Sequence, residues 1–565
     1  MSTIGPVSFN DNTPLESGTN SDSDTDDEDL SYSDNLSSHS ATLDADSLPS
    51  TIEVQPTDAV KMILAQARVS SGMTETQLED LELAKPLKED QSISTSSSYE
   101  PDDTPDYKAV CSDWQQHDLH VFVLSEAGKP VYSRYGDEGR LASIMGVMKA
   151  LVSFVAASGD ELQAIHTDER TFMFLTRPHL ILVAVGRSSE SRAHMLVCLS
   201  YVYSQILSLI TLQRLDLHFT KYANLDLRRL LVGDNRLISS IVDFASESFG
   251  AFLQSVGYVP LSSQTRETIA NIISQSVKSR LPFLSSLLLC VFIKLYAFVH
   301  EQDVVFSLLL HRNHVVSLVC MKGQTLHASD VHLIINLVGN SRALKSAQTH
   351  WLPICLPKFD ANGFLYAHIA SLDEHTSLVL LSVDSTQFYA LEEAKDTIFK
   401  RLQSTSDGEP LVELTSAQFP SVREIGVPEL RHLVCKCIAV NQHVASEWDV
   451  PYDSPSSIVP DTSVSLSCPS EEHLASTTRS LRNHVLMTYR RMHSRLHNPS
   501  THPTRLIYQS TPTEVFFAWK TDSFELFCTL EPLTSKTSLH EIRKTLLKWF
   551  TSRKHYLFSL CSPTF

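Results

Sequence analysis

The stretch from residue 120 to residue 158 reads HVFVLSEAGKPVYSRYGDEGRLASIMGVMKALVSFVAAS, and it decides the fold. Two short apolar runs, 120–124 and 130–135, flank the turn residues 126–129, a pattern that predicts a β-hairpin. The run 139–158 is long and apolar, which predicts a helix. We therefore predict two antiparallel strands followed by one apolar helix.

The residues downstream complete a small antiparallel module. Strand patterns cover 161–166, 171–176 and 180–185, and helical patterns follow at 191–211 and 224–231. The order is strand, strand, helix, three strands and two helices. This is the order of a longin module, a five-stranded antiparallel sheet with one helix on one face and two on the other. We assign this module to residues 115–265.

A similar order recurs twice, in residues 303–405 and 425–565. The predicted elements of the second unit are strands at 304–310, 315–321, 351–358, 363–371 and 378–383, and helices at 329–338 and 387–402. Those of the third are strands at 433–440, 505–509, 515–520 and 524–530, and helices at 471–497 and 539–551. We therefore predict an α+β fold of three longin-like modules. Roughly 100–200 residues per domain fits this division of 565 residues.

The net charge of −19 is concentrated in the first 110 residues, which hold 23 acidic and five basic side chains. This segment is rich in Ser, Thr, Asp and Pro and cannot bury enough apolar surface to offset its ordering entropy, so we expect a disordered acidic tail over 1–110. Ser21, Ser23 and Thr25 lie among acidic residues and are candidate phosphorylation sites. We expect this tail to fold back on basic regions and limit the access of partners.

The helix predicted over 139–158 is apolar around its whole circumference. The stripe expected to face its own sheet is Ile144, Val147, Met148, Leu151 and Val155. The opposite face carries Ala142, Met145, Val152 and Ala156 where a surface helix would carry polar residues. A neighbouring domain or a partner chain would explain this pattern, and we favour a partner chain.

Sequence signatures of catalysis are missing. The chain has no phosphate-binding Gly-x-x-x-x-Gly-Lys-Ser/Thr, no Gly-x-Ser-x-Gly and no His-Glu-x-x-His. His493 and His497 have the spacing of two zinc ligands on a helix, but no Cys, Asp or Glu pair follows at suitable spacing, so we interpret this helix as basic and solvated. Cys435 and Cys437 alternate on a strand, which favours core thiols. We expect no catalytic residue, no metal and no cofactor.

Positive charge gathers in residues 470–565, which hold 13 basic and seven acidic side chains. The predicted basic patch consists of Arg479, Arg482, Arg490, Arg491 and Arg495 in one helix with Lys544 and Lys548 in the last helix. An ordinary solvated face and an anionic membrane contact both fit this pattern, and each basic residue near an anionic leaflet contributes about 1 kcal/mol. Aromatic residues for base stacking are sparse, so we expect no nucleic-acid partner.

Several stretches carry the signature of a known family. They are SEAGKPVYSRYGDEGRLASIMGVMKALVSF (125–154), GDELQAIHTDERTFMFLTRPHLILVAV (159–185), YVYSQILSLITL (201–212), NLDLRRLL (224–231), CLPKFDANGFLYAHI (355–369), GVPELRH (426–432) and HSRLHN (493–498). On these residues the chain from about 115 to 565 resembles the SAND family of vacuolar fusion proteins, which contains the Mon subunit of the Mon–Ccz complex.

The resemblance implies three longin domains and an obligate longin partner of the Ccz kind. It implies guanine-nucleotide exchange on the late-endosomal or vacuolar Rab GTPase, which promotes endosome maturation and membrane fusion. The protein would be cytoplasmic and recruited peripherally to the anionic, phosphoinositide-bearing surface of late endosomes, lysosomes or vacuoles. In the family the first longin domains pair and bind the Rab, which gives the interface candidates Tyr135, Gly136, Asp137, Glu138, Arg140, Ile144, Met145, Met148 and Val152.

Two alternatives remain open at this point. A longin-type trafficking adaptor would bind a GTPase without exchanging its nucleotide and would prefer the GTP-bound form. An integral membrane protein would be anchored through 281–299, which is nearly apolar over a length that spans a bilayer, although Pro282 and Lys294 weaken that interpretation. Compared with the family, 281–303 looks like an insertion, either a gene-model artefact or a species-specific loop.

Overall fold

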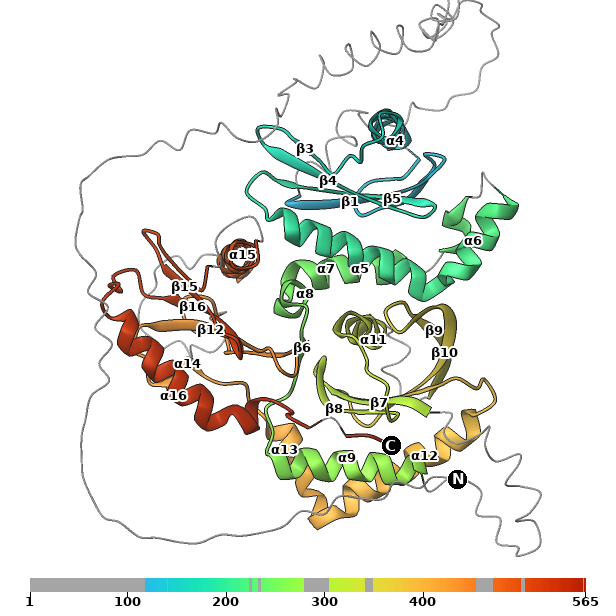
Figure 1. Ribbon diagram of the computed structural model, residues 1–565. Helices are drawn as coiled ribbons and strands as arrows, with labels where there is room; N and C mark the ends of the chain where they lie inside the picture. Colours follow the sequence, from blue (N-terminus) through green and yellow to red (C-terminus); the bar gives the residue numbers. More distant parts are fainter. Residues whose placement is uncertain are drawn as a thin grey trace, which may run out of the picture. The chain divides into compact units, whose positions relative to one another are not determined.

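The computed structural model contains three sheets flanked by helices, and all strand pairs within them are antiparallel except one in the third sheet (Figure 1). The residues that the structure describes are 117–139, 141–222, 226–231, 235–278, 304–340, 349–453, 471–498, 504–561 and 563–565. The predicted acidic tail with Ser21, Ser23 and Thr25, the interface candidate Arg140 and the apolar segment 281–303 lie outside these residues.

The first module has five strands in the order β2-β1-β5-β4-β3. The strands are β1 (Leu119–Ser125), β2 (Pro130–Ser133), β3 (Ala164–His166), β4 (Arg170–Arg177) and β5 (Leu180–Arg187). The helices α4 (Ala142–Ala157) and α5 (Arg192–Ile210) lie on opposite faces of this sheet (Figure 1). Strand β1 alternates, because Phe122 belongs to the core under α4 whereas Val121 and Val123 belong to the core under α5.

Downstream of α5 the structure differs from the prediction. The helix predicted over 224–231 is described from residue 226 on, and this part forms a short 3-10 turn, η1 (Leu227–Leu230). Two helices that we did not predict lie on either side of it in the sequence, α6 (Leu212–Lys221) and α7 (Asn235–Glu247). The Asp226 side chain accepts hydrogen bonds from the backbone N–H of Arg228 (3.2 Å) and from its guanidinium. Such local side-chain bonds compete with a regular helix.

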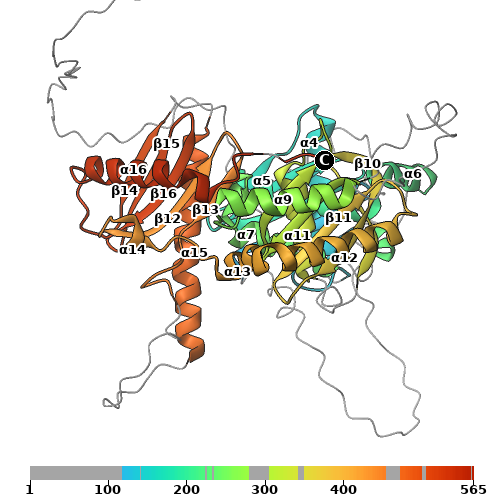
Figure 2. The ribbon, with the colours of Figure 1, turned by 90° about the horizontal axis from the view of Figure 1, so that it is seen from below.

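The second module repeats the strand order of the first, as β8-β7-β11-β10-β9. Its strands are β7 (Val304–His311), β8 (His314–Cys320), β9 (His350–Leu356), β10 (Asp360–Ser371) and β11 (Thr376–Ser382). Helix α11 (Ala328–Asn340) packs on one face. On the other face α12 (Phe388–Ser404) lies beside α9 (Ser263–Lys278), a helix that we did not predict (Figure 2).

The third module has six strands in the order β14-β15-β16-β12-β13-β6, two more than the four strands predicted from the sequence. Its own strands are β12 (Leu430–Cys437), β13 (Gln442–Ala445), β14 (Leu506–Ser510), β15 (Val515–Lys520) and β16 (Phe524–Leu530). Helix α15 (Glu471–Leu496) covers one face and α16 (Leu539–Leu557) the other. The predicted strand 433–440 is in fact the start of a hairpin, which turns at Asn441 with a φ of 50°, a left-handed conformation that asparagine tolerates.

The sixth strand comes from far away in the sequence. Strand β6 (Val256–Gly257) follows α8 (Phe249–Leu253) and pairs in parallel with β13. Two residues later, the backbone N–H of Val259 donates to the carbonyl of Val315 in the second sheet (3.0 Å). The segment that leaves the first module therefore bonds to both of the other two sheets. The remaining short elements are η3 (Thr405–Gly408), α13 (Glu409–Ser416) and α14 (Val422–Ile425).

Candidate partner-binding surface

Helix α4 lies on its sheet through a different stripe from the one that we predicted. Leu141, Met145, Met148 and Val152 are buried against the sheet, whereas Val147, which we expected to face the sheet, is 52% exposed. An all-apolar helix has no polar face to fix its rotation, so the sequence does not decide which stripe packs. Of the interface candidates, Met145 and Met148 are therefore buried against the sheet, whereas Val152, which is 7% exposed, lines a surface pocket.

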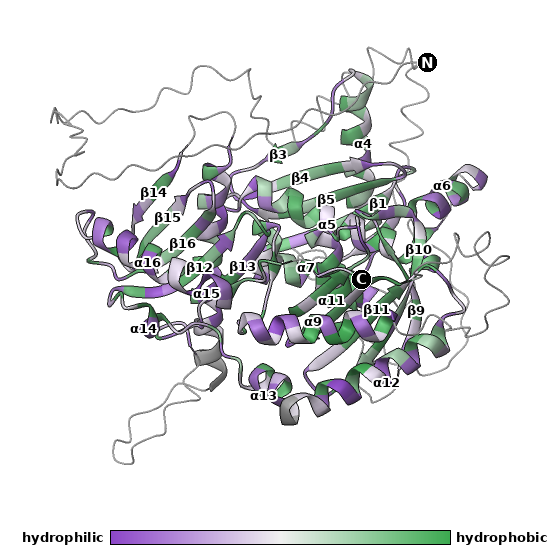
Figure 3. Ribbon diagram, turned by 60° about the horizontal axis from the view of Figure 1, so that its bottom comes forward, coloured by the Kyte–Doolittle hydropathy of each residue, from purple (hydrophilic) through white to green (hydrophobic). Residues whose placement is uncertain are grey.

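The outer face of α4 is nevertheless apolar, as predicted. Val147 and Phe154 are 52% and 41% exposed, and they lie two helical turns apart on the same side. Ala150 between them is exposed, and Leu151 and Val155 are half-buried. In Figure 3, α4 is mostly green and white, whereas α9 and α12 show purple residues on their outer sides. We call Val147, Ala150, Leu151, Phe154 and Val155 the outer face of α4.

The turn that leads into α4 holds the other interface candidates. Gly136 has a φ of +85°, a conformation in which glycine carries no steric cost. The Tyr135 ring stacks on His117 with ring centres 3.6 Å apart, and the backbone N–H of Ser133 donates to Glu138 (3.3 Å). Asp137 is exposed and Ile144 is half-buried. The turn is therefore a fixed structure at the N-terminal end of the helix.

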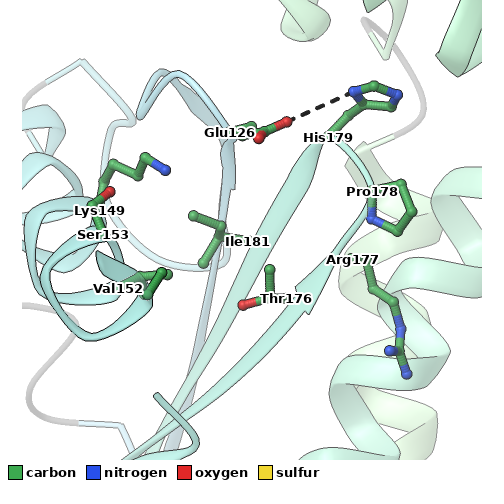
Figure 4. Close-up of a pocket in the computed structure, with 10 residues that line it drawn as sticks. Glu126, Lys149, Val152, Ser153, Thr176, Arg177, Pro178, His179 and Ile181 are labelled. Atoms are coloured by element: carbon green, nitrogen blue, oxygen red, sulfur yellow. Dashed lines mark ion pairs between the residues drawn. The ribbon is translucent and has the colours of Figure 1, made fainter. Parts of the chain in front are cut away.

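A surface pocket of about 550 Å³ lies between α4 and the β4–β5 turn (Figure 4). Lys149 and Ser153 line it from α4, and Glu126 lines it from the first hairpin. His179 in the β4–β5 turn lies 3.9 Å from the Glu126 carboxylate and 3.0 Å from that of Asp216. Charged groups beside an apolar helix face have the composition of an interface rim. The sequence did not predict this pocket, because the β4–β5 turn is distant from α4 in the sequence and comes close to it only when the sheet forms.

The predicted basic patch is not one surface. On β15, Phe516 and Ala518 belong to the core beneath α15, whereas Val515 and Phe517 belong to the core beneath α16. The two helices therefore lie on opposite faces of the third sheet (Figure 1). The exposed basic residues form two separate sets, Arg479, Arg491 and Arg495 on α15 and Lys544 and Lys548 on α16.

Two arginines of the predicted patch instead bond to other parts of the protein. The Arg490 side chain is 5% exposed, donates to the carbonyl of Ser246 and lies 3.7 Å from the Glu190 carboxylate. Arg482 donates to the carbonyl of Tyr452 (2.6 Å). The interpretation of α15 as a solvated helix is also wrong at His493, whose pKa burial lowers to about 3. Arg490 is thus unavailable to a membrane.

Two further predictions concern buried groups. Cys435 and Cys437 are 2% and 1% exposed and are core thiols, as predicted. Burial raises the pKa of Cys435 well above that of a free thiol. Within the described ranges, one helix, α5, is long and apolar enough to cross a membrane, and 67% of that apolar window is buried inside the protein.

Comparison with known proteins defines the class first. The models of the first, second and third longin domains of FUZ, MON1 and HPS1 match residues 119–241, 302–400 and 429–554. The chain is therefore a protein of three longin domains, which confirms the predicted fold class. We refer below to the three modules as the first, second and third longin domains.

Relatives of known name then define the family. The chain is 35% identical to vacuolar fusion protein MON1 homolog A of Bos taurus over 81% of this chain and 74% of that protein. It is 33% identical to protein SAND of Takifugu rubripes over 88% and 86% of the two chains. It is 32% identical to MON1 homolog B of Mus musculus over 85% and 82%. The chain belongs to the MON1/SAND family, a family of vacuolar fusion proteins, and the predicted resemblance is confirmed.

Proposed function

We propose that the chain is the Mon-type subunit of a two-subunit guanine-nucleotide exchange factor. Its partner is a Ccz-type longin subunit, its substrate is the late-endosomal or vacuolar Rab GTPase, and its site of action is the cytoplasmic face of late endosomes, lysosomes or vacuoles. Family membership supports this proposal. The subunit itself contributes binding surfaces rather than a catalytic acid, base or nucleophile.

Exchange by binding requires a difference in affinity. A factor that binds the nucleotide-free GTPase better than the nucleotide-bound form shifts the population toward the empty state. To reverse a ratio of 1:99 the difference in affinity must be about 10⁴-fold, or about 5.5 kcal/mol. An extended contact surface can supply a difference in affinity of this size. The features of the chain that matter for exchange are therefore the helix and sheet faces that its own domains leave exposed.

The outer face of α4 is the observation that carries the proposal. Helix α11 holds the same position in the second longin domain, between the first hairpin and the last three strands, and its outer side is covered by the first domain. There the Tyr201 hydroxyl bonds to Nδ1 of His332 (2.8 Å), and the Asn336 amide donates to Gln205 (2.8 Å). On α4, Val147 and Phe154 stay open to solvent within the described part of the chain. A partner subunit would cover α4 as the first domain covers α11.

The test measures release of a fluorescent GDP analogue from the Rab by the full-length chain co-purified with its Ccz-type partner. We expect the pair to accelerate release and neither subunit alone to do so. Absence of acceleration by the pair would refute the exchange function. Preferential binding to the GTP-bound Rab without release would establish the adaptor alternative instead.

A second arm tests the surface. Covering the exposed half of Val147 or Phe154 contributes about 1 kcal/mol each, and an unpaired buried carboxylate costs several kcal/mol more. The double variant Val147→Asp/Phe154→Asp should therefore bind the partner at least about 100-fold more weakly, since each 1.4 kcal/mol is tenfold. The control Leu533→Asp changes a leucine that is 94% exposed in the third domain, and it should bind normally. Equal affinity of the double variant would contradict a partner on α4.

A further inference from the structure

The third longin domain brings together a set of side chains with the character of metal ligands. His493 and His497 lie one helical turn apart near the C-terminal end of α15, and Glu525 lies on β16 beneath them. Nε2 of His497 is 2.9 Å from Oε1 of Glu525, and Nε2 of His493 is 3.9 Å from Oε2. One ligand atom from each of the three residues fits within 4.8 Å of the others.

The Glu525 carboxylate shows that this place is built for positive charge. Its side chain is 3% exposed, and Oε2 has no hydrogen-bond partner. A buried carboxylate oxygen without a partner is costly unless a cation or a donor approaches it. Among the residues that the structure describes, the ion-pairing groups within 4 Å of this carboxylate are His493, His497 and the Lys520 ammonium.

Two lysines flank this carboxylate, and one of them competes for it. Lys436 on β12 and Lys520 on β15 are its cross-strand neighbours. Lys436 donates its ammonium to the carbonyl of Leu253 (2.7 Å) and so points to another acceptor. Lys520 lies 3.7 Å from Glu525 and 3.3 Å from Nε2 of His497, which places one positive charge between two of the three ligand atoms. Because its side chain is 34% exposed, Lys520 can turn into solvent when a metal ion takes this place.

We propose that His493, His497 and Glu525 form a Zn²⁺ site in which water fills the fourth position. Two imidazoles four residues apart on a helix and one carboxylate are a ligand set that Zn²⁺ favours, with bonds of about 2.0–2.2 Å. Ligand atoms around a tetrahedral ion then lie roughly 3.4 Å apart, and one ligand atom from each of the three residues already lies within 4.8 Å of the others. The bound ion would tie the end of α15 to the β15–β16 hairpin.

The third ligand explains why the sequence pattern looked incomplete. Glu525 follows His497 by 28 residues and comes from a strand, so no short spacing motif contains it. The sheet register, which pairs Glu525 with Lys436 and Lys520, turns this carboxylate toward α15. The site is independent of the exchange function proposed above, because it lies in another domain from α4.

The experiment titrates Zn²⁺ into metal-stripped full-length protein by calorimetry, with Co²⁺ absorption as a probe of coordination geometry. Wild-type protein should bind one equivalent. His497→Ala, a change at a side chain that is 33% exposed, should weaken binding at least about tenfold and abolish the visible bands of four-coordinate Co²⁺. Removal of the competing ammonium in Lys520→Met should strengthen binding. The matched control His540→Ala removes an exposed histidine from α16 and should bind as wild type does.

Opposite effects at His497 and Lys520 separate a metal site from a loss of folding, since a loss of folding would change Zn²⁺ binding in the same direction in both variants. Zn²⁺ binding that is the same in wild type and His497→Ala would overturn the proposal. So would binding that His540→Ala weakens as much as His497→Ala does, or binding that Lys520→Met weakens.

Discussion

The buried contact of Arg490 allows a sharp test, because we first assigned this residue to a membrane surface. Arg490 on α15 reaches the first longin domain, where it meets Glu190 and the carbonyl of Ser246. The side chains of Arg490 and Glu190 are 5% and 10% exposed. Removing one member of such a buried pair leaves the other charge uncompensated, which costs about 3–5 kcal/mol. Arg490→Met should therefore destabilise the protein by about 3 kcal/mol.

The assay is urea unfolding of the full-length chain, followed by tryptophan fluorescence. Glu190→Gln should destabilise by a similar mechanism. The double variant Glu190→Gln/Arg490→Met should cost less than the two single changes together, since it leaves no unpaired charge. Arg491→Met, a change at the exposed neighbour, should stay within about 0.5 kcal/mol of wild type.

Vesicle binding separates the structural role of Arg490 from the membrane role first predicted for it. At a temperature where the wild-type protein and Arg490→Met are both folded, the two should bind anionic vesicles equally well. A stability equal to that of wild type together with a clear loss of vesicle binding would refute the buried pair. Strictly additive single and double changes would also show that Arg490 and Glu190 do not interact.

Two further predictions concern the membrane and pH. A flat membrane meets only one face of the third sheet, so only one of two charge reversals should reduce flotation with phosphoinositide vesicles. The two variants are Lys544→Glu/Lys548→Glu on α16 and Arg491→Glu/Arg495→Glu on α15. Equal losses of flotation would contradict the separation of the two basic sets. In the described part of the chain burial lowers the pKa of five histidines, among them His332 and His443, to about 3, so the unfolded chain takes up protons first and stability falls as pH drops below about 6.5. At pH 5.5 each of these histidines costs about 1.4 kcal/mol, and Asp330, whose pKa burial raises to about 6, returns about 1 kcal/mol of the total. Urea midpoints at pH 7.5 and 5.5 measure this loss, and equal midpoints would contradict it.

The elements that the sequence predicts well are those whose pattern is local. The hairpin β1–β2 and helix α5 lie within one or two residues of their expected bounds, because strand alternation and a long apolar period are visible in a short window. Strand β6 could not be predicted in this way. It has two residues, and its partner β13 begins at Gln442, far along the chain.

The candidate site was predictable in kind but not in detail. Composition alone shows that α4 is apolar on all sides, and an exposed apolar face follows from it. Which residues are exposed depends on how Met145 and Met148 fill the space above the sheet, and flexible side chains of this kind fit more than one rotation of the helix. The prediction of one basic patch was wrong for a related reason. The charge of Arg490 in the sequence does not show that an acidic partner, Glu190, lies in another domain.

Repetition of one module within a chain makes its surfaces comparable. The helix between the first hairpin and the later strands is α4 in the first domain, α11 in the second and α15 in the third. The outer side of α11 meets the first domain through His332, and α15 meets it through Arg490. In two of three cases, then, this helix contacts the first domain through buried polar groups. Helix α4 has the same place in its module but carries Val147 and Phe154 in solvent. Since the same helix contacts another domain in two of the three modules, α4 is the surface on which we expect a separate longin subunit to bind.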